Sequence, residues 1–379
     1  MKPLTQYGIP LALLGISCLS HAQSSITLYG IVDDGLAYTN NSGGHSNFQL
    51  ASGRPGGNRW GLLGSEDLGG GLKAVFTLEN GFDLSTGKLG QNGRLFGRQA
   101  FVGLSDNRSG TVTLGRQYTS ARDFLGPLAL TSPGGGLAAH PYDNDNLNNS
   151  FFVDNAVKYQ SVNYGGFQFG GLYGFSNAAG HFADSRIYNL SASYKFGGLT
   201  IASTYMQLNN GGSTTNASGA VTSGDATFNA GRQRTWGAGA NYAFGAATAG
   251  IVITQTQLKN PTSIRSSAAG TSSNLPLTHG DARFTNYEVN GSYTFTPAFT
   301  LLGAYTYTDA HLNGVRPKYQ QITALADYLL SKRTDLFLEA AFQHVTGTGN
   351  SGITADINGV SASSTNSQVV ATVGIRHRF

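Results

Sequence analysis

The sequence is poor in sulfur. It has one cysteine, Cys18, and two methionines in 379 residues. Cys18 lies in an apolar N-terminal stretch that we expect to be removed, so the mature chain has no thiol for a disulfide, a zinc site or a catalytic nucleophile. Lipid attachment at Cys18 is an alternative reading, but the residues before it lack the leucine usual at such sites.

Long apolar runs are also missing. After residues 7–19 no stretch supplies the roughly 18 apolar residues that a membrane-spanning helix needs. The stretch 7–19 follows Lys2 and precedes the small residues Ser20 and Ala22, which is typical of a secretory leader. We predict a cleaved signal peptide at 1–22 and a single mature domain at 23–379. Any membrane-spanning structure in it must be β.

Charge is scarce and nearly balanced. Only 12% of the residues are charged, with 24 Lys and Arg against 20 Asp and Glu, so nothing suggests a nucleic-acid partner. A mean hydropathy of −0.16 is too polar for a helical membrane protein, and 53 glycines depart from an ordinary soluble domain. A barrel with one lipid face and one wet face would give this average.

What the chain does have is strict two-residue alternation. A strand between lipid and water must change polarity at every residue. The alternation is clearest in residues 72–79, 188–196, 235–244 and 287–295. In the last of these segments, Tyr287, Val289 and Tyr293 share one parity, and Glu288 and Asn290 share the opposite parity. These segments predict membrane-spanning strands with one oily and one wet face.

Aromatic pairs close successive strands just before short turns. They are Tyr194 with Phe196, Tyr242 with Phe244, and Tyr293 with Phe295. Rings at one depth on the outer face are typical of an interfacial aromatic girdle, whereas the core of a soluble β-sandwich would explain the alternation but not this clustering.

Turns and long polar stretches also alternate along the chain. Short turns fall near Gly165, Gly197, Gly245 and Pro297, and longer stretches rich in Ser, Thr, Asn and Gly separate them. This asymmetry predicts an all-β, antiparallel, sixteen-stranded transmembrane barrel with short periplasmic turns and long extracellular loops. Its strands begin near Ile26 and end at Phe379. Closure of the ring is required because lipid offers no partner to an open sheet edge.

Several motifs resemble those of a known family. They are LYGIVD at 28–33, GSEDLGGGLKA at 64–74, FGRQAFVGL at 96–104, TLGRQ at 113–117, LSKRTD at 330–335 and the ending GIRHRF at 374–379. In order and spacing they resemble the Gram-negative general porins, specifically the trimeric group of β-proteobacteria.

The resemblance implies a homotrimeric general diffusion porin of the bacterial outer membrane, passing small hydrophilic solutes and ions. The third long loop would fold inward and narrow the channel. The C-terminal Phe379 would be the signal read by the barrel-assembly machinery, and outer-membrane lipid and lipopolysaccharide would surround the barrel. No cofactor, metal or enzymatic activity is expected.

The third loop supplies the candidate acids of the constriction. We place this loop at about 119–151, where several Pro and Gly residues permit irregular backbone, which is tolerated at membrane depth where it lines a water-filled cavity. Asp123, Asp143 and Asp145 are its acids, and we expect them on the negative side of the opening.

The candidate basic wall combines parity with the resemblance. Parity turns Arg59 into the lumen, the resemblance implies the same for Arg98, and Lys158 lies on an inward parity. Family members often carry further bases where this chain has Phe152 and Leu63, which puts strong anion selectivity in doubt. Selectivity in such channels is set by pore width and by the field at the narrowest point. A purely structural role for both arginines, as partners of loop carboxylates, is the alternative.

Charges with outward parity suggest a subunit contact. Asp34 shares parity with apolar Val32, and Arg116 with Leu114. An Arg facing hydrocarbon costs roughly 2–4 kcal/mol at mid-membrane. We therefore expect Asp34 and Arg116 at a trimer interface, with Arg116 meeting an acid such as Asp83 from a neighbour. A position among lipid headgroups at the rim is the alternative.

Two other functions stay open at this point. An outer-membrane hydrolase would need Ser, His and an acid converging at one rim, and no spacing singles out such a set. A substrate-specific channel would need a row of aromatics in the lumen, whereas most aromatics here have outward parity. The mature histidines lie mostly in loops without ligand spacing, so no metal site is expected.

Overall fold

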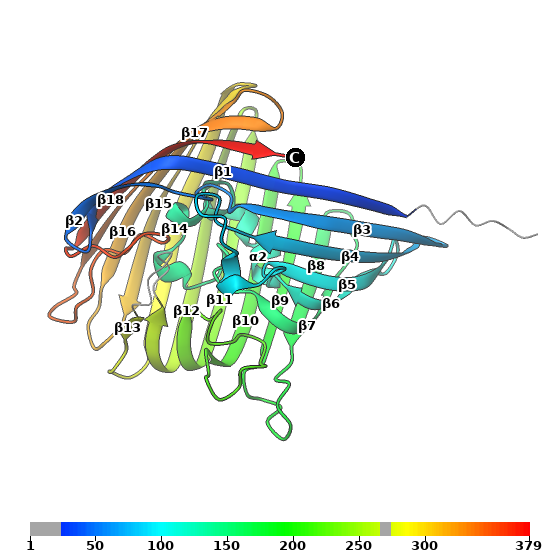
Figure 1. The fold of residues 1–379 in the computed structure, drawn as a ribbon, viewed down its shortest axis with the longest axis horizontal. Helices are drawn as coiled ribbons and strands as arrows, with labels where there is room; N and C mark the ends of the chain where they lie inside the picture. Colours follow the sequence, from blue (N-terminus) through cyan, green and yellow to red (C-terminus); the bar gives the residue numbers. More distant parts are fainter. Residues whose placement is uncertain (1–23, 266–273) are drawn as a thin grey trace, which may run out of the picture.

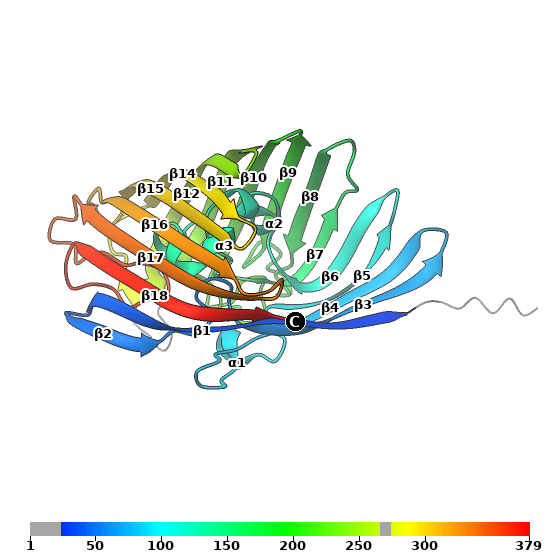
Figure 2. The same cartoon turned by 90° about the horizontal axis from the view of Figure 1, so that it is seen from above.

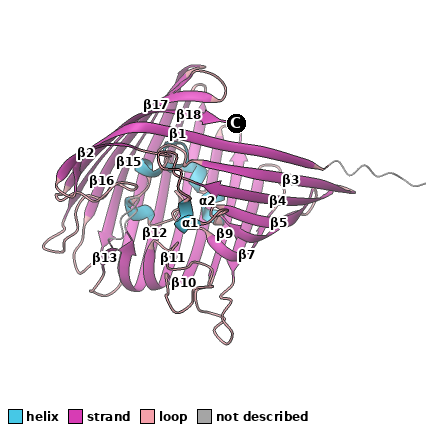
Figure 3. Ribbon diagram, viewed as in Figure 1, coloured by secondary structure: helices cyan, strands magenta, loops and turns pink. Residues whose placement is uncertain are grey.

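The computed structural model describes residues 24–265 and 274–379, and the expected leader at 1–22 lies outside them. One antiparallel sheet forms the whole fold and closes on itself (Figures 1 and 3). The sixteen barrel strands are β1 (Ser25–Ser42), β3 (Arg59–Gly69), β4 (Leu72–Gly81), β5 (Gln99–Asp106), β6 (Gly110–Gln117), β7 (Val153–Gln160), β8 (Phe167–Gly174), β9 (Ile187–Phe196), β10 (Leu199–Gly211), β11 (Phe228–Phe244), β12 (Ala247–Arg265), β14 (Ala282–Thr296), β15 (Phe299–His311), β16 (Lys318–Leu329), β17 (Thr334–Thr346) and β18 (Ser367–Arg378).

The remaining elements lie in the connections. Two short strands, β2 (His45–Leu50) and β13 (Asn274–Pro276), extend the sheet beyond the barrel, and α1 (Gly90–Gly93) lies in the loop after β4. The loop after β6 contains α2 (Ser120–Phe124), η1 (Gly126–Leu128), α3 (Thr131–Gly134), η2 (Gly136–Ala138) and η3 (Pro141–Asp143). No helix in the described ranges has the length and apolarity to cross a membrane.

The first and last strands close the ring. β1 pairs with β18 from Ile31↔Arg378 to Thr39↔Val370, and its first residues pair with β3. Gly30 and Phe379 exchange two backbone hydrogen bonds of 3.0 and 3.1 Å. The predicted closed barrel of sixteen strands is therefore confirmed, with its first strand starting one residue earlier than expected.

Side-chain exposure follows the predicted alternation. On β14, Tyr287, Val289 and Tyr293 are exposed on the outside, while Asn286 and Glu288 are buried inside the barrel. The predicted aromatic pairs near the short turns are all exposed, from 38% at Tyr194 to 70% at Phe196. The outer face therefore carries the apolar surface and the belt of aromatic residues that a bilayer requires.

The wall is uneven in height. Strands β5 to β8 have eight residues each, whereas β10, β11, β12 and β14 have 13, 17, 19 and 15. The short strands lie together on one side of the ring, as Figure 2 shows. On that side, loops must form the upper part of the channel wall.

Loop 3 (118–152) folds into the barrel, as predicted (Figure 2). Its residues Ala121, Leu125 and Leu147 form a buried cluster with Ala202 of β10 and Val252 of β12. Gly237 and Gly239 on β11 make room for the loop, since a Cβ at either position would lie only 3.0 and 3.2 Å from Leu125. An apolar contact thus holds the loop against the wall of longer strands.

Adjacent leucines on β15 test which face is which. Leu301 is exposed on the outside and Leu302 lines the lumen. We expect Leu301→Arg to lower the free energy of unfolding by between about 1 and 4 kcal/mol, depending on depth, because the charge meets lipid. Leu302→Arg, at the same depth, should cost less than half of that. Urea unfolding in lipid vesicles, followed by Trp fluorescence, measures both, and equal losses would contradict the assigned faces.

Candidate functional site

A cavity of about 1340 Å³ runs through the barrel interior beside loop 3. Its walls come from β1, β3, β15, β16, β18 and several of the loops. Among the lining residues eight are basic and three are acidic: Arg54, Arg59, Lys88, Arg98, Arg122, Arg265, Arg376 and Arg378 against Asp83, Asp225 and Asp327. The channel interior therefore has an excess of positive charge.

Arg59 and Arg98, the two arginines expected on the basic wall, both line the cavity and share one carboxylate. The Nε of Arg98 lies 2.7 Å from Oε1 of Glu79, and the Nε of Arg59 lies 3.6 Å from its Oε2. The hydroxyls of Tyr118 and Tyr29 donate to the same carboxylate at 2.6 and 2.8 Å. Two guanidinium groups with one acid leave this group with a net positive charge.

Arg98 reaches the lumen although its parity is outward. Val102 and Leu104, which share that parity, are exposed on the lipid face. Arg98 lies just before β5, so strand alternation does not fix its direction, and its Nη2 donates to the Tyr118 hydroxyl at 2.8 Å. The start of the strand therefore explains why Arg98 points into the lumen.

Phe152, where the family resemblance implies a base, packs against two bases. Its ring centroid lies 5.7 Å from Cζ of Arg98 and 5.0 Å from Cζ of Arg116, and its ring contacts that of Tyr118 at 5.5 Å. Guanidinium groups over an aromatic face gain cation–π attraction. Phe152 itself carries no charge, but its ring contacts two guanidinium groups and helps to hold them in place.

Lys158 points inward, as its parity predicted, but its charge is paired. Its Nζ forms an ion pair with Asp123 on α2 and donates to the Tyr118 carbonyl at 3.0 Å. Neither Lys158 nor Asp123 lines the cavity. The pair attaches the start of loop 3 to β7 and adds no net charge to the lumen.

The prediction that Asp143 and Asp145 face the opening is wrong. They are 1% and 0% exposed, and neither lines the cavity. Asp143 accepts the backbone N–H groups of Asn148 and Ser150 at 2.9 Å, and burial raises its pKa to about 7. The irregular loop 3 turns these carboxylates inward because they satisfy its own buried backbone.

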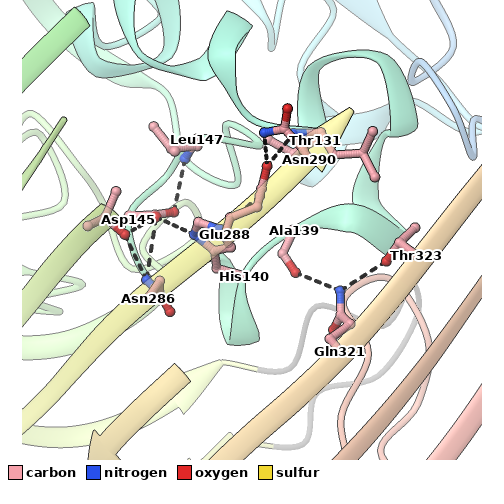
Figure 4. A network of polar contacts seen from close by, with 12 residues as sticks. Thr131, Ala139, His140, Asp145, Leu147, Asn286, Glu288, Asn290, Gln321 and Thr323 are labelled. Atoms are coloured by element: carbon pink, nitrogen blue, oxygen red, sulfur yellow. Dashed lines mark hydrogen bonds and ion pairs between the residues drawn. The ribbon is translucent and has the colours of Figure 1, made fainter. Parts of the chain in front are cut away.

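Asp145 belongs to a buried lock between loop 3 and the barrel (Figure 4). The ring of His140 lies between two carboxylates, with Nδ1 2.6 Å from Asp145 and Nε2 3.0 Å from Glu288 on β14. Thr254 on β12 donates to Asp145 at 2.6 Å. Burial alone would lower the pKa of His140, but the two carboxylates outweigh it and raise this pKa to about 10.

Arg122 is a site residue that the sequence analysis missed. It lies on α2 of loop 3, lines the cavity and has no ion pair within 4.0 Å in the described part of the chain. Its neighbour Asp123 is consumed by Lys158. Loop 3 therefore presents a base, and no acid, to the cavity. Because α2 is irregular in the sequence pattern, no parity could have separated Arg122 from Asp123.

The residues expected at a subunit contact fall in different places. Asp34 faces outward as expected, beside an apolar groove that includes Leu36 and Ile375, and accepts the Ser85 hydroxyl at 2.7 Å. Asp83 accepts the Thr86 backbone N–H at 2.9 Å within its own loop.

The expectation that Arg116 needs an acid from a neighbour is corrected. Arg116 is 7% exposed and pairs within its own chain with Asp154 at 2.5 Å and Asp225 at 2.9 Å. A bulge explains the change: opposite Gly115–Gln117 of β6, the partner strand β7 advances three residues instead of two. Strand alternation therefore ends before Arg116.

In residues 24–265 and 274–379, no group of three or more His, Cys, Asp or Glu side chains is arranged to hold a metal ion.

Comparison with known proteins gives the fold and cavity a context. The family model of the Gram-negative porins matches residues 11–348. The chain belongs to the Gram-negative porin family. This porin is 31% identical to an outer membrane porin protein of Bordetella pertussis, over 97% of each chain. It is 30% identical to outer membrane porin protein 32 of Delftia acidovorans, over 98% of this chain and 99% of that one.

A solved structure gives the same picture. The anion-selective porin from Comamonas acidovorans superposes with a TM-score of 0.75 at 28% identity, covering 94% of this chain and all of that one. This protein is a porin channel of the bacterial outer membrane, and its relatives point to a channel rather than an enzyme.

The lock at His140 gives a pH-dependent prediction. We expect His140→Gln to lower the melting temperature of the porin, because it leaves two buried carboxylates without a cation, a loss of about 3–5 kcal/mol. The raised pKa means that the wild-type contribution is complete below the ordinary histidine pKa of about 6.5 and is lost as pH rises through about 10. Thermal unfolding in detergent from pH 6 to 11 measures the gap between the two proteins. A gap that stays constant up to pH 11 would show that His140 is uncharged.

Proposed function

We propose that this porin is a general diffusion channel with a preference for small anions. The observation that carries the proposal is that loop 3 presents Arg122, and no carboxylate, to the cavity that Arg59 and Arg98 also line. An excess of positive charge along an aqueous path raises the local anion concentration and repels cations.

The balance of partners supports this preference. Glu79 neutralises only one of the two wall arginines, and Asp327 with Asp335 offsets Arg376 and Arg378 below them. The absent bases at Phe152 and Leu63 are therefore offset by the absence of opposing acids. The anion-selective porin with a similar fold is in keeping with this arrangement.

The lining also supports passage without specific recognition. Asn148, Asn149 and Ser150 of loop 3 offer polar groups, and the aromatic lining within the described residues is limited to Tyr118, Tyr142 and Phe152 of the same loop, of which Tyr118 and Phe152 are in ring contact. A specific sugar channel would need aromatics in a continuous row. We propose that neutral hydrophilic solutes pass by size, and anions with an added electrostatic advantage.

Assembly as a homotrimer is a further part of the proposal. Asp34 faces outward beside the groove of Leu36, Leu50, Val373 and Ile375, where its carboxylate accepts hydrogen bonds from Ser85 and the Gly35 N–H but lipid would offer it no counter-charge. A neighbouring subunit would cover it, and lipid with lipopolysaccharide would surround the rest. Phe379, 41% exposed at the closing seam, is the proposed signal for the barrel-assembly machinery.

Arg122→Gln tests the anion preference. A unit charge about 4 Å from a permeating ion in water contributes about 1 kcal/mol, so we expect the anion-to-cation permeability ratio to fall roughly two- to five-fold. Arg98→Ala should lower the ratio as well. The measurement is the reversal potential of planar bilayers in a salt gradient.

Arg316→Gln is the matched control, because it removes the same charge from a residue that does not line the cavity. It should leave the permeability ratio unchanged. The proposed preference is wrong if wild-type protein favours cations, or if Arg122→Gln and Arg316→Gln give the same reversal potential as wild type.

A further inference from the structure

Two extracellular loops that start far apart in the ring meet over the low side of the wall. Loop 2 (82–98) follows β4 and loop 5 (212–227) follows β10, so six strands separate their bases. The Nη1 of Arg94 in loop 2 donates to both carboxylate oxygens of Asp225 in loop 5, at 2.8 and 2.7 Å. The backbone carbonyl of Gly224 accepts a hydrogen bond of 2.6 Å from Nδ2 of Asn92.

The barrel rim completes this junction. Arg116 at the end of β6 donates to Asp225 at 2.9 Å and to Asp154 at the start of β7 at 2.5 Å. Its Nε also donates to the Gly97 carbonyl of loop 2 at 2.7 Å. Arg94, Arg116, Asp154 and Asp225 thus form a network of two bases and two acids at the point where the wall is lowest.

Loop 5 reaches this point by packing along the inside of the barrel. Its residues Ala220, Val221 and Ala226 are buried in a cluster with inward-facing side chains of β7, β8, β9 and β10. The backbone N–H of Asp154 donates to the Ala220 carbonyl at 2.8 Å. Loop 5 therefore acts as an added layer of wall above the short strands.

The junction borders the permeation path. Gln91 and Asn92 from loop 2 and Gly224 and Asp225 from loop 5 all line the cavity. Arg116 links it to the constriction through the ring of Phe152. The junction and Arg98 therefore line the same cavity.

We propose that the junction of loops 2 and 5 is a second, outer size filter of this channel, and that Asp225 is the residue that sets its width. Asp225 is the only carboxylate of the described chain that pairs with both Arg94 of loop 2, at 2.7 Å, and Arg116 of the rim, at 2.9 Å, within hydrogen-bond distance. Without the Asp225 charge, Asp154 alone remains to pair with both guanidinium groups, at 3.8 Å from Arg94 and 2.5 Å from Arg116. The repulsion between the two bases then exceeds what one acid offsets, and we expect the loops to separate.

Asp225→Asn tests the filter with neutral solutes. Liposome swelling in a monosaccharide, a disaccharide and a trisaccharide measures relative permeation, and uncharged sugars do not respond to the proposed anion preference. We expect the trisaccharide-to-monosaccharide rate ratio to rise at least two-fold over wild type. Arg94→Ala, at a more exposed residue, should also raise the trisaccharide-to-monosaccharide ratio. This variant replaces Asp225→Asn in the test if Asp225→Asn does not fold.

Asp281→Asn is the matched control, since it breaks an exposed ion pair with Lys259 away from the cavity. Its sugar ratios should equal those of wild type. If folded Asp225→Asn and Arg94→Ala also sieve like wild type, the junction does not limit solute size and the proposal is wrong.

A cross-link separates loop position from charge. A Cβ at Gly224 would lie 3.3 Å from Cγ of Asn92, which is within reach of a disulfide. Asn92→Cys with Gly224→Cys can be added to Asp225→Asn without competing thiols, because Cys18 is the sole cysteine of the sequence. Asn92 has a φ of 60°, so Asn92→Cys alone in the same background controls for backbone strain.

Oxidation of the triple variant should return the sugar ratios to wild-type values, and reduction with dithiothreitol should raise them again. If the oxidised, cross-linked porin still sieves like Asp225→Asn, the separation of the loops is not what sets the size limit, and the inference is overturned.

Discussion

Satisfaction of the backbone is the constraint on which this structure depends. In lipid an unpaired N–H or C=O has no substitute partner, so the sheet must end where it begins. The pairing of β1 with both β3 and β18, completed by the two hydrogen bonds between Gly30 and Phe379, removes the last free edge. The alternation of apolar and polar side chains, the aromatic ring and the wet interior all follow from that closure.

Inside the barrel, the charge of the channel depends on which charged side chains are paired with an opposite charge. Loop 3 carries three acids, and each is consumed: Asp123 by Lys158, Asp143 by the backbone of its own loop, and Asp145 by His140 and Thr254. These contacts hold the loop against the wall and remove negative charge from the opening. Because these acids are paired elsewhere, Arg122 has no ion-pair partner among the described residues, so the contacts that anchor the loop also leave its surface toward the channel positive.

Strand alternation predicted the fold, the outer face and the lumenal position of Arg59, because within a regular strand each residue's face is fixed by its neighbours. Strand alternation does not predict the direction of a side chain where a strand ends. Arg98 lies one residue before β5 and Arg116 sits opposite a bulge, so their directions depend on contacts with Glu79, Asp154 and Asp225 from distant parts of the chain. Asp143 and Asp145 could not be placed either, since loop 3 has no period to follow.

The uneven wall has a consequence for how the barrel sits in a membrane. A spanning strand needs about 9–11 tilted residues, and β5 to β8 have eight each. The strands on this side are therefore too short to cross the full thickness of a flat bilayer, whereas the long strands on the opposite side are long enough. Hydrophobic mismatch confined to one flank is relieved most cheaply by covering that flank with protein or by thinning the lipid there. The short strands thus give the barrel a preferred side for contact with another protein or with thinned lipid.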